Sequence, residues 1–164
     1  MKKIVLALAA LLFSFAAHAQ TQAHAAPAIH EFTTDSLGNI IANQKGHPFV
    51  LVIWSLDCEF CQSSLDTLSK KKHANKNLRI VTLGTDSMAD EQAVSLMKKK
   101  LGTLGLSADA WAFGDTPPEQ LRYALDKKWH GEMPRSYWFD AQGNSTARSG
   151  VITAENFDHL MAGK

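Results

Sequence analysis

Residues 49–61 carry the strongest structural signal in the chain and read Phe49-Val50-Leu51-Val52-Ile53-Trp54-Ser55-Leu56-Asp57-Cys58-Glu59-Phe60-Cys61. Its opening run is wholly apolar and rich in β-branched and aromatic side chains, which predicts a strand buried on both faces of a central sheet. A helix should follow at once, because Cys61, Leu65 and Leu68 fall at helical spacing and form one apolar stripe. We expect Asp57 to be the N-cap of that helix.

Downstream of this stretch, apolar segments alternate between strand-like and helix-like patterns. The predicted elements are strands at 78–83, 110–113 and 136–139, an antiparallel return at 145–148, and helices opening at Ser87, at the capping box of residues 116–119 and at Thr153.

Upstream, residues 32–41 suggest a small edge hairpin, because Asp35 and the pair Gly38-Asn39 stand between short apolar pieces. The order of elements then predicts an α/β architecture. Its central sheet should be mixed, with helices on both faces and an N-terminal hairpin extension.

Composition is that of an ordinary globular protein. The chain has 164 residues, of which 45% are hydrophobic and 20% charged, so it suits one folded domain and excludes disorder. The formal charge of +1 offers no electrostatic basis for binding nucleic acid. Two cysteines are too few for a small fold held together by disulfides.

The first residues have the pattern of an export signal. Lys2 and Lys3 precede an apolar run over residues 4–17, and Ala17-His18-Ala19 supplies small residues where signal peptidase cuts. A membrane anchor is the alternative, but such a run spans roughly 21 Å, short of the roughly 30 Å hydrocarbon core. We therefore expect residues 1–19 to be a cleavable signal peptide.

Cleavage before Gln20 would leave a flexible leader over residues 20–31 and one domain over residues 32–164. The destination would be an oxidising exported compartment, most simply a bacterial periplasm, or the medium.

Chemistry is concentrated in Cys58-Glu59-Phe60-Cys61, which holds both cysteines of the chain. Two intervening residues let both sulfurs meet within the first helical turn, where free N–H groups and the helix dipole stabilise a thiolate. Cys58 should therefore be the nucleophile and Cys61 the resolving thiol.

Two other uses of the pair stay open. A permanent disulfide would close so short a loop that it adds only about 2 kcal/mol of stability. A metal site is also conceivable, although one such pair is half of a four-cysteine zinc site.

A later motif, Gly131-Glu132-Met133-Pro134 followed by Tyr137-Trp138-Phe139-Asp140, adds to the cysteine pair and to the strand before it. With these motifs the chain, from about Phe32 to its C-terminus, resembles thioredoxin-like proteins of the exported TlpA/ResA type. The resemblance implies a thioredoxin fold, disulfide exchange with protein partners, and no cofactor beyond the redox-active disulfide. A membrane thiol transducer would return the electrons. Some members serve cytochrome c maturation, and others reduce cysteines at copper sites.

The resemblance also implies site residues. Pro134 matches the family's cis-proline, which would present the Met133 backbone beside the sulfurs so that an extended substrate can pair with it. A trans proline at the start of an edge strand is the alternative. We expect Phe60 to shape an apolar contact surface between the cysteines.

The chain departs from the family where proton-handling groups are usual. Asp57 replaces an aromatic residue before the first cysteine, Ser64 replaces an acid after the second, and the preceding strand lacks a buried acid. Asp57 and Glu59 flank Cys58 instead. Negative charge nearby raises the pKa of a thiol, which favours a more reducing couple and hence a reductase. Asp57 could equally serve only as the N-cap.

His130 lies four residues before Pro134 and could tune Cys58. It also supports a rival function, a copper(I) chaperone in which Met133 or His130 adds a third ligand to the two thiolates. Related copper chaperones of the Sco type space their cysteines by three residues, which argues against that function. A third alternative is a DsbA-like oxidase. We expect a monomer, because no unexplained apolar stripe remains.

Overall fold

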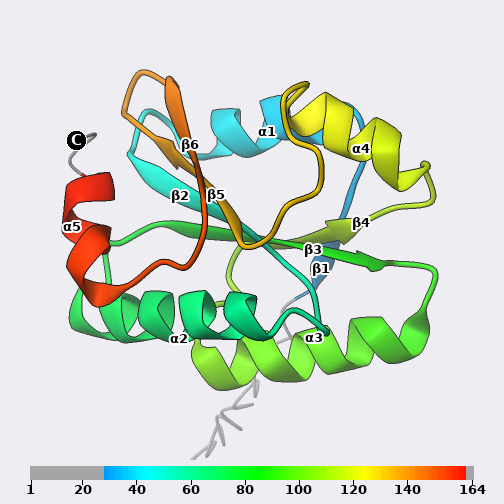
Figure 1. Ribbon diagram of the computed structural model, residues 1–164, viewed down its shortest axis with the longest axis horizontal. Coiled ribbons are helices and arrows are strands. Elements are labelled where there is room, and N and C mark those ends of the chain that lie inside the picture. The colour runs from blue at the N-terminus through cyan, green and yellow to red at the C-terminus, as the bar shows by residue number, and fades with distance from the viewer. Residues whose placement is uncertain (1–27, 162–164) are drawn as a thin grey trace, which may run out of the picture.

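Residues 28–161 are described by the computed structural model, and they surround one central sheet (Figure 1). The elements in chain order are β1 (Ile29–Phe32), α1 (Ser36–Asn43), β2 (Phe49–Trp54), α2 (Glu59–Ala74), β3 (Ile80–Ser87), α3 (Glu91–Leu104), β4 (Ala110–Phe113), α4 (Pro118–Leu125), β5 (Arg135–Phe139), β6 (Ser145–Ser149) and α5 (Ala154–Met161).

The sheet has the strand order β1-β4-β3-β2-β5-β6. Strands β1, β4, β3 and β2 are parallel, whereas β5 runs antiparallel to β2, and β6 runs antiparallel to β5. The predicted mixed sheet is therefore confirmed. Strand β2 lies between β3 and β5 and is buried at all six of its positions, as its unbroken apolar run predicts.

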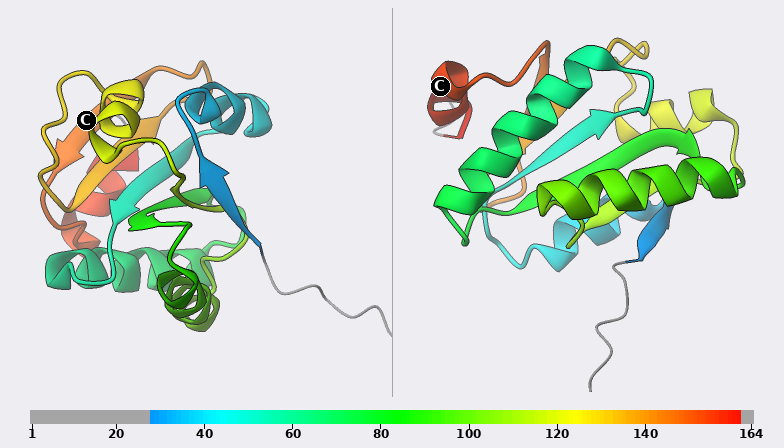
Figure 2. Two further views of the ribbon diagram at one scale, coloured as in Figure 1. Left: turned by 90° about the vertical axis from the view of Figure 1, so that its right-hand side faces the viewer. Right: turned by 90° about the horizontal axis from the view of Figure 1, so that it is seen from below.

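Helices cover both faces of this sheet, as the sequence predicts (Figures 1 and 2). Helices α2 and α3 lie on one face, with α5 beside α2, and α1 and α4 lie on the other. Alternate residues of β2 serve the two cores: Val50, Val52 and Trp54 pack with Leu65 and Leu68 of α2, and Leu51 and Ile53 pack with Ile40 of α1 and Leu121 of α4.

The hairpin expected over residues 32–41 is wrong. Strand β1 ends at Phe32, and α1 begins at Ser36, whose hydroxyl accepts the Thr33 N–H at 2.9 Å. Leu37, Ile40 and Ile41 then fall at helical spacing and pack into the core on the α4 side, so Gly38-Asn39 is helical and forms no turn.

Strand β1 also takes in residues 29–31 of the predicted flexible leader, because it pairs with β4 along its whole length. The expected signal peptide, residues 1–19, and the leader as far as residue 27 lie outside the described residues. Among the helices of residues 28–161, none is long and apolar enough to span a membrane.

Three predicted helix starts have different outcomes. Strand β3 continues to Ser87, and α3 is capped by Asp90, whose carboxylate accepts the Gln92 and Ala93 N–H groups. The capping box at residues 116–119 is wrong, because Pro117 is the N-cap of α4 and makes no side-chain cap. Thr153 does cap the last helix, since its hydroxyl accepts the Asn156 N–H at 3.2 Å.

The segment between β6 and α5 joins two parts of the fold. The Gly150 N–H donates to the Pro134 carbonyl at 2.9 Å, and the Ile152 N–H donates to the Ser64 hydroxyl at 3.0 Å. Ser64 lies in α2 and is fully buried. Residues 150–152 therefore contact both the start of β5 and the helix that begins at the cysteine pair.

Replacing Ser64 with alanine should leave the buried Ile152 N–H without its acceptor. We expect the free energy of unfolding of the oxidised protein to fall by about 1–3 kcal/mol, measured by urea denaturation. Ser63→Ala is the matched control, because Ser63 is exposed on the same helix and should change stability by no more than about 0.5 kcal/mol. Equal effects of the two variants would contradict the role given to Ser64.

Candidate functional site

The two cysteines lie where β2 gives way to α2. Cys58 is the N-cap of α2, and its sulfur accepts the Cys61 N–H at 3.1 Å. The sulfurs are joined in a disulfide, with the Cα atoms 5.2 Å apart. Cys58 is partly exposed, whereas Cys61 is fully buried. The structure thus places both sulfurs in the first turn, with only Cys58 open to a partner.

The prediction that Asp57 caps α2 is wrong, because the cap is the sulfur of Cys58 one residue later. The side chains of Asp57 and Glu59 are both exposed on either side of Cys58. The negative charges expected beside this cysteine are therefore present, but solvent surrounds them.

The Met133-Pro134 segment reaches the same edge of the sheet from β5. Arg135 pairs with Ile53 in the antiparallel register, so the residues just before β5 lie beside the end of β2. The Met133-Pro134 peptide bond is cis, as the family resemblance implied. Pro134 is buried, and Met133 is partly buried and packs against the cores on both sides of the sheet.

Phe60 is 65% exposed, the largest exposed fraction among the large apolar side chains of the described residues. It lies between the two cysteines in the first turn of α2. An aromatic ring that gains nothing from the protein's own core is available for contact with a partner.

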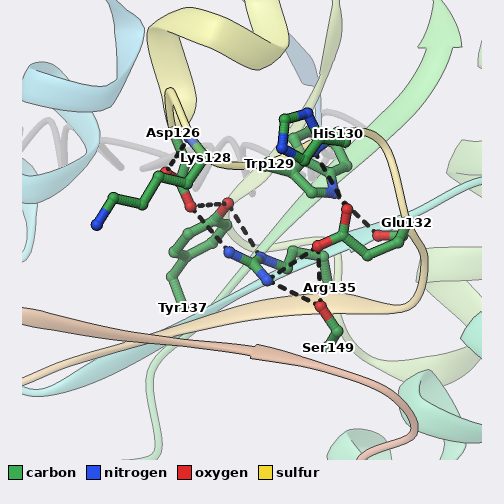
Figure 3. Close-up of polar contacts among 8 residues, drawn as sticks. All are labelled: Asp126, Lys128, Trp129, His130, Glu132, Arg135, Tyr137 and Ser149. Carbon is green, nitrogen blue, oxygen red and sulfur yellow. Dashed lines mark hydrogen bonds and ion pairs between the residues drawn. The ribbon is translucent and has the colours of Figure 1, made fainter.

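A polar network holds the segment that precedes Pro134 (Figure 3). The Arg135 guanidinium donates to Asp126 at 2.9 Å, to Glu132 at 3.1 Å and to the Ser149 hydroxyl at 2.8 Å. Tyr137 donates its hydroxyl to Asp126 at 3.1 Å. Because Arg135 follows the proline directly, one side chain ties both ends of the segment 126–134 to β5 and β6.

The network shifts the ionisation of its members. Burial opposes ionisation of Asp126, but the Lys128 N–H, Arg135 and Tyr137 together lower the pKa of its carboxyl. The pKa of Glu132 is lowered in the same way, against its slight burial, by backbone N–H groups, Ser149 and Arg135. Burial raises the pKa of Tyr137 to about 12, so its hydroxyl stays a donor.

Asp86 is a site residue that sequence reasoning missed. It lies near the end of β3, and its carboxylate accepts the Leu56 N–H at 3.0 Å, two residues before Cys58. Burial is the main cause that raises the pKa of this carboxyl. A usable signal was its place just after the buried run of β3, because the carboxyl ends of neighbouring parallel strands meet at one edge of a sheet.

His130 does not join the network through its side chain. It is exposed, its backbone N–H donates to Glu132 at 3.2 Å, and its imidazole points away from Arg135 (Figure 3). Within residues 28–161, no three His, Cys, Asp or Glu side chains are grouped so that they could hold a metal ion.

Replacing Arg135 with glutamine should make the free energy of unfolding depend less on pH in the acidic range. The pKa values of Asp126 and Glu132 are lower in the folded protein than in the unfolded chain, where they are near 4. The stability that these carboxylates add is therefore fully present above the unfolded pKa values and is lost as the pH falls through the folded pKa values. Between about pH 5 and pH 3, the wild-type free energy of unfolding should fall more than that of Arg135→Gln, measured by urea denaturation at fixed pH.

Lys99→Gln is the control for this prediction, because Lys99 is an exposed cation on α3, far from the network in sequence. It should keep the wild-type slope. The same slope in Arg135→Gln and wild type would show that the guanidinium does not set the ionisation of these carboxylates.

Comparison with solved structures shows the fold. A secreted Mycobacterium tuberculosis disulfide oxidoreductase, described as homologous to E. coli DsbE, is 21% identical and aligns with a TM-score of 0.52 over 75% of this chain and 86% of its own. A thiol:disulfide interchange protein from Chlorobium tepidum is 22% identical, with a TM-score of 0.54 over 74% of this chain and 81% of its own.

A DsbF homologue from Corynebacterium diphtheriae is 16% identical, with a TM-score of 0.55 over 76% of each chain. A search of curated proteins found no match. The family model described as a thioredoxin-like domain matches residues 39–163, which include the cysteine pair and the Met133-Pro134 segment. The chain therefore belongs to the thioredoxin-like family.

Proposed function

We propose that this protein is a thiol:disulfide oxidoreductase that exchanges disulfides with protein partners through Cys58 and Cys61. The observation that carries the proposal is the unequal exposure of a bonded pair at a helix N-terminus. Cys58 is partly exposed and caps α2, whereas Cys61 is fully buried. A permanent disulfide has no need of this asymmetry, but a nucleophile and a resolving thiol do.

The reaction begins with the reduced protein. The Cys58 thiolate attacks one sulfur of a partner disulfide, a bond forms between the two proteins, and the partner's other sulfur leaves as a thiolate that takes a proton from water. Cys61 then loses its proton to solvent and attacks the Cys58 sulfur, which releases the partner's second thiolate. Two electrons have passed to the partner, and the Cys58–Cys61 disulfide remains.

The reducing direction is supported by the charges around Cys58. Asp57 and Glu59 flank it, and Asp86 contacts the turn that precedes it. Negative charge disfavours a thiolate, so it makes the reduced form a better electron donor. The N-terminal sequence supports export to a periplasm or the medium, where a membrane thiol transducer would reduce the protein again.

Substrate binding is assigned to the surface around Cys58. An extended partner segment would pair with the backbone of Met133 before the cis Pro134, and its apolar side chains would contact Phe60. The Arg135 network would hold the Met133-Pro134 segment in place for this pairing.

Cysteine variants test the reaction. Cys58→Ser should abolish reduction of insulin disulfides, because the exposed nucleophile is lost. Cys61→Ser should accumulate a covalent complex with partner proteins, because the mixed disulfide cannot be resolved, and this complex should disappear on a non-reducing gel after dithiothreitol treatment.

The double variant Cys58→Ser/Cys61→Ser is the control and should trap nothing. Trapping by Cys58→Ser instead of Cys61→Ser would reverse the assigned roles. A reduction potential near that of strong periplasmic oxidants, about −120 mV, would exclude the reducing direction.

Phe60→Ala should lower kcat/KM for protein substrates more than for small ones. We expect kcat/KM for insulin to fall about three- to tenfold beyond any change with glutathione disulfide, which carries no large apolar side chain for the ring to contact. Tyr123→Ala is the matched control, because Tyr123 is 59% exposed on α4 and should leave both values unchanged. A parallel fall with both substrates would remove Phe60 from the contact surface.

A further inference from the structure

Asp86 connects β3 to the turn that leads into the cysteine pair. Trp54 of β2 pairs with Gly84 of β3 in a parallel register, so the residues after Trp54 run beside those after Gly84. There the Leu56 N–H donates to the Asp86 carboxylate at 3.0 Å. Two residues later, the Cys58 N–H donates to the Ser55 carbonyl at 3.3 Å and closes the turn.

A side chain of α2 also holds this turn. The Gln62 side-chain amide donates to the Ser55 carbonyl at 3.3 Å. Gln62 brings no charge to the turn, whereas Asp86 brings a carboxylate. Of the side chains that hold the turn by hydrogen bonds to its backbone within residues 28–161, Asp86 alone is ionisable.

Among residues 28–161, no cation forms an ion pair with the carboxylate of Asp86. The charged groups that act most strongly on it are Asp57 from the turn and Asp90 from the start of α3. Partial burial is the main cause that raises the pKa of Asp86, and with these two acidic neighbours it outweighs the backbone N–H groups of Leu56 and Asp86. Less solvent surrounds Asp86 than the exposed Asp57, so its charge is less screened.

We propose that Asp86 is a positioning residue that also makes the Cys58–Cys61 couple more reducing, because it holds the Leu56–Cys58 turn with a negative charge two residues before Cys58. The inference rests on the proposed function and names the regulation of that site. On reduction the disulfide gains two electrons and Cys61 takes a proton from water, which leaves a thiolate on Cys58. That thiolate forms near Asp86, and the repulsion destabilises the reduced form.

Asp86→Asn tests this inference, because asparagine keeps an acceptor oxygen for the Leu56 N–H but removes the charge. The equilibrium of the oxidised protein with reduced glutathione should shift about three- to tenfold toward the reduced protein, which corresponds to about 15–30 mV. The ionisation midpoint of the Cys58 thiol, read from thiolate absorbance, should fall in the same variant.

The pH dependence separates the charge from a merely structural role. The difference in equilibrium between wild type and Asp86→Asn should shrink as the pH falls, because Cys58 then takes a proton and leaves no thiolate for Asp86 to repel, and Asp86 itself becomes neutral at still lower pH. A difference that is constant with pH would assign the effect to geometry and overturn the inference.

Two further variants complete the experiment. Asp66→Asn removes the same charge from an exposed position on α2 and should leave the equilibrium within about twofold of wild type, since surface charges are screened. Asp86→Ser keeps a hydroxyl acceptor without the charge, so it takes the place of Asp86→Asn if that variant does not fold, and it should shift the equilibrium in the same direction.

The outcomes distinguish the two proposals. Wild-type protein that reduces insulin through Cys58, with Asp86→Asn and Asp66→Asn at the same equilibrium, overturns the role of Asp86 alone. Wild-type protein with no disulfide exchange overturns the proposed function, whatever the glutathione equilibrium of the variants.

Discussion

Strand β2 is buried at every position, with α2 on one face of the sheet and α1 and α4 on the other, and neighbouring strands are hydrogen-bonded along both of its edges. Burial on both faces leaves its end almost no freedom, because any shift would open two cores at once. Three segments meet at that end: the turn into α2, the end of β3 with Asp86, and the Met133-Pro134 segment before β5. The geometry of the site follows from this packing.

The carboxylates at and near that edge show how differently one fold can treat the same group. Asp126 lies against the Arg135 guanidinium and Tyr137, and its pKa is lowered despite its burial. Burial raises the pKa of Asp86, and two acidic neighbours add to the rise against the Leu56 and Asp86 backbone N–H groups. The first arrangement holds a segment in place. The second holds a carboxylate whose ionised form becomes less stable as its surroundings become more negative.

Much of the fold could be predicted from patterns that act locally. Burial explains the apolar run of β2 and the helical stripe of Leu65 and Leu68. The spacing of the cysteines is equally local, because it places both sulfurs in one helical turn. The errors came where distant partners decide. Gly38-Asn39 is a turn signal that α1 overrides by packing on the sheet, and the contact between Asp86 and Leu56 depends on the register of β3 beside β2. The cap of α2 was missed because a cysteine sulfur does what the adjacent aspartate was expected to do.

Residues 150–152 reach Pro134 with one backbone N–H and Ser64 of α2 with another. This short segment connects α2, which begins at the cysteine pair, to the segment that contains Pro134. An insertion or deletion in it would shift these two parts of the site relative to each other. The turn between β5 and β6 lies at the ends of these two strands that are distant from Pro134 and from residues 150–152, and it is exposed at Asp140 and Gln142. Fluorophores, affinity tags or fused domains for capturing partners should therefore be inserted in that turn and not in residues 150–152.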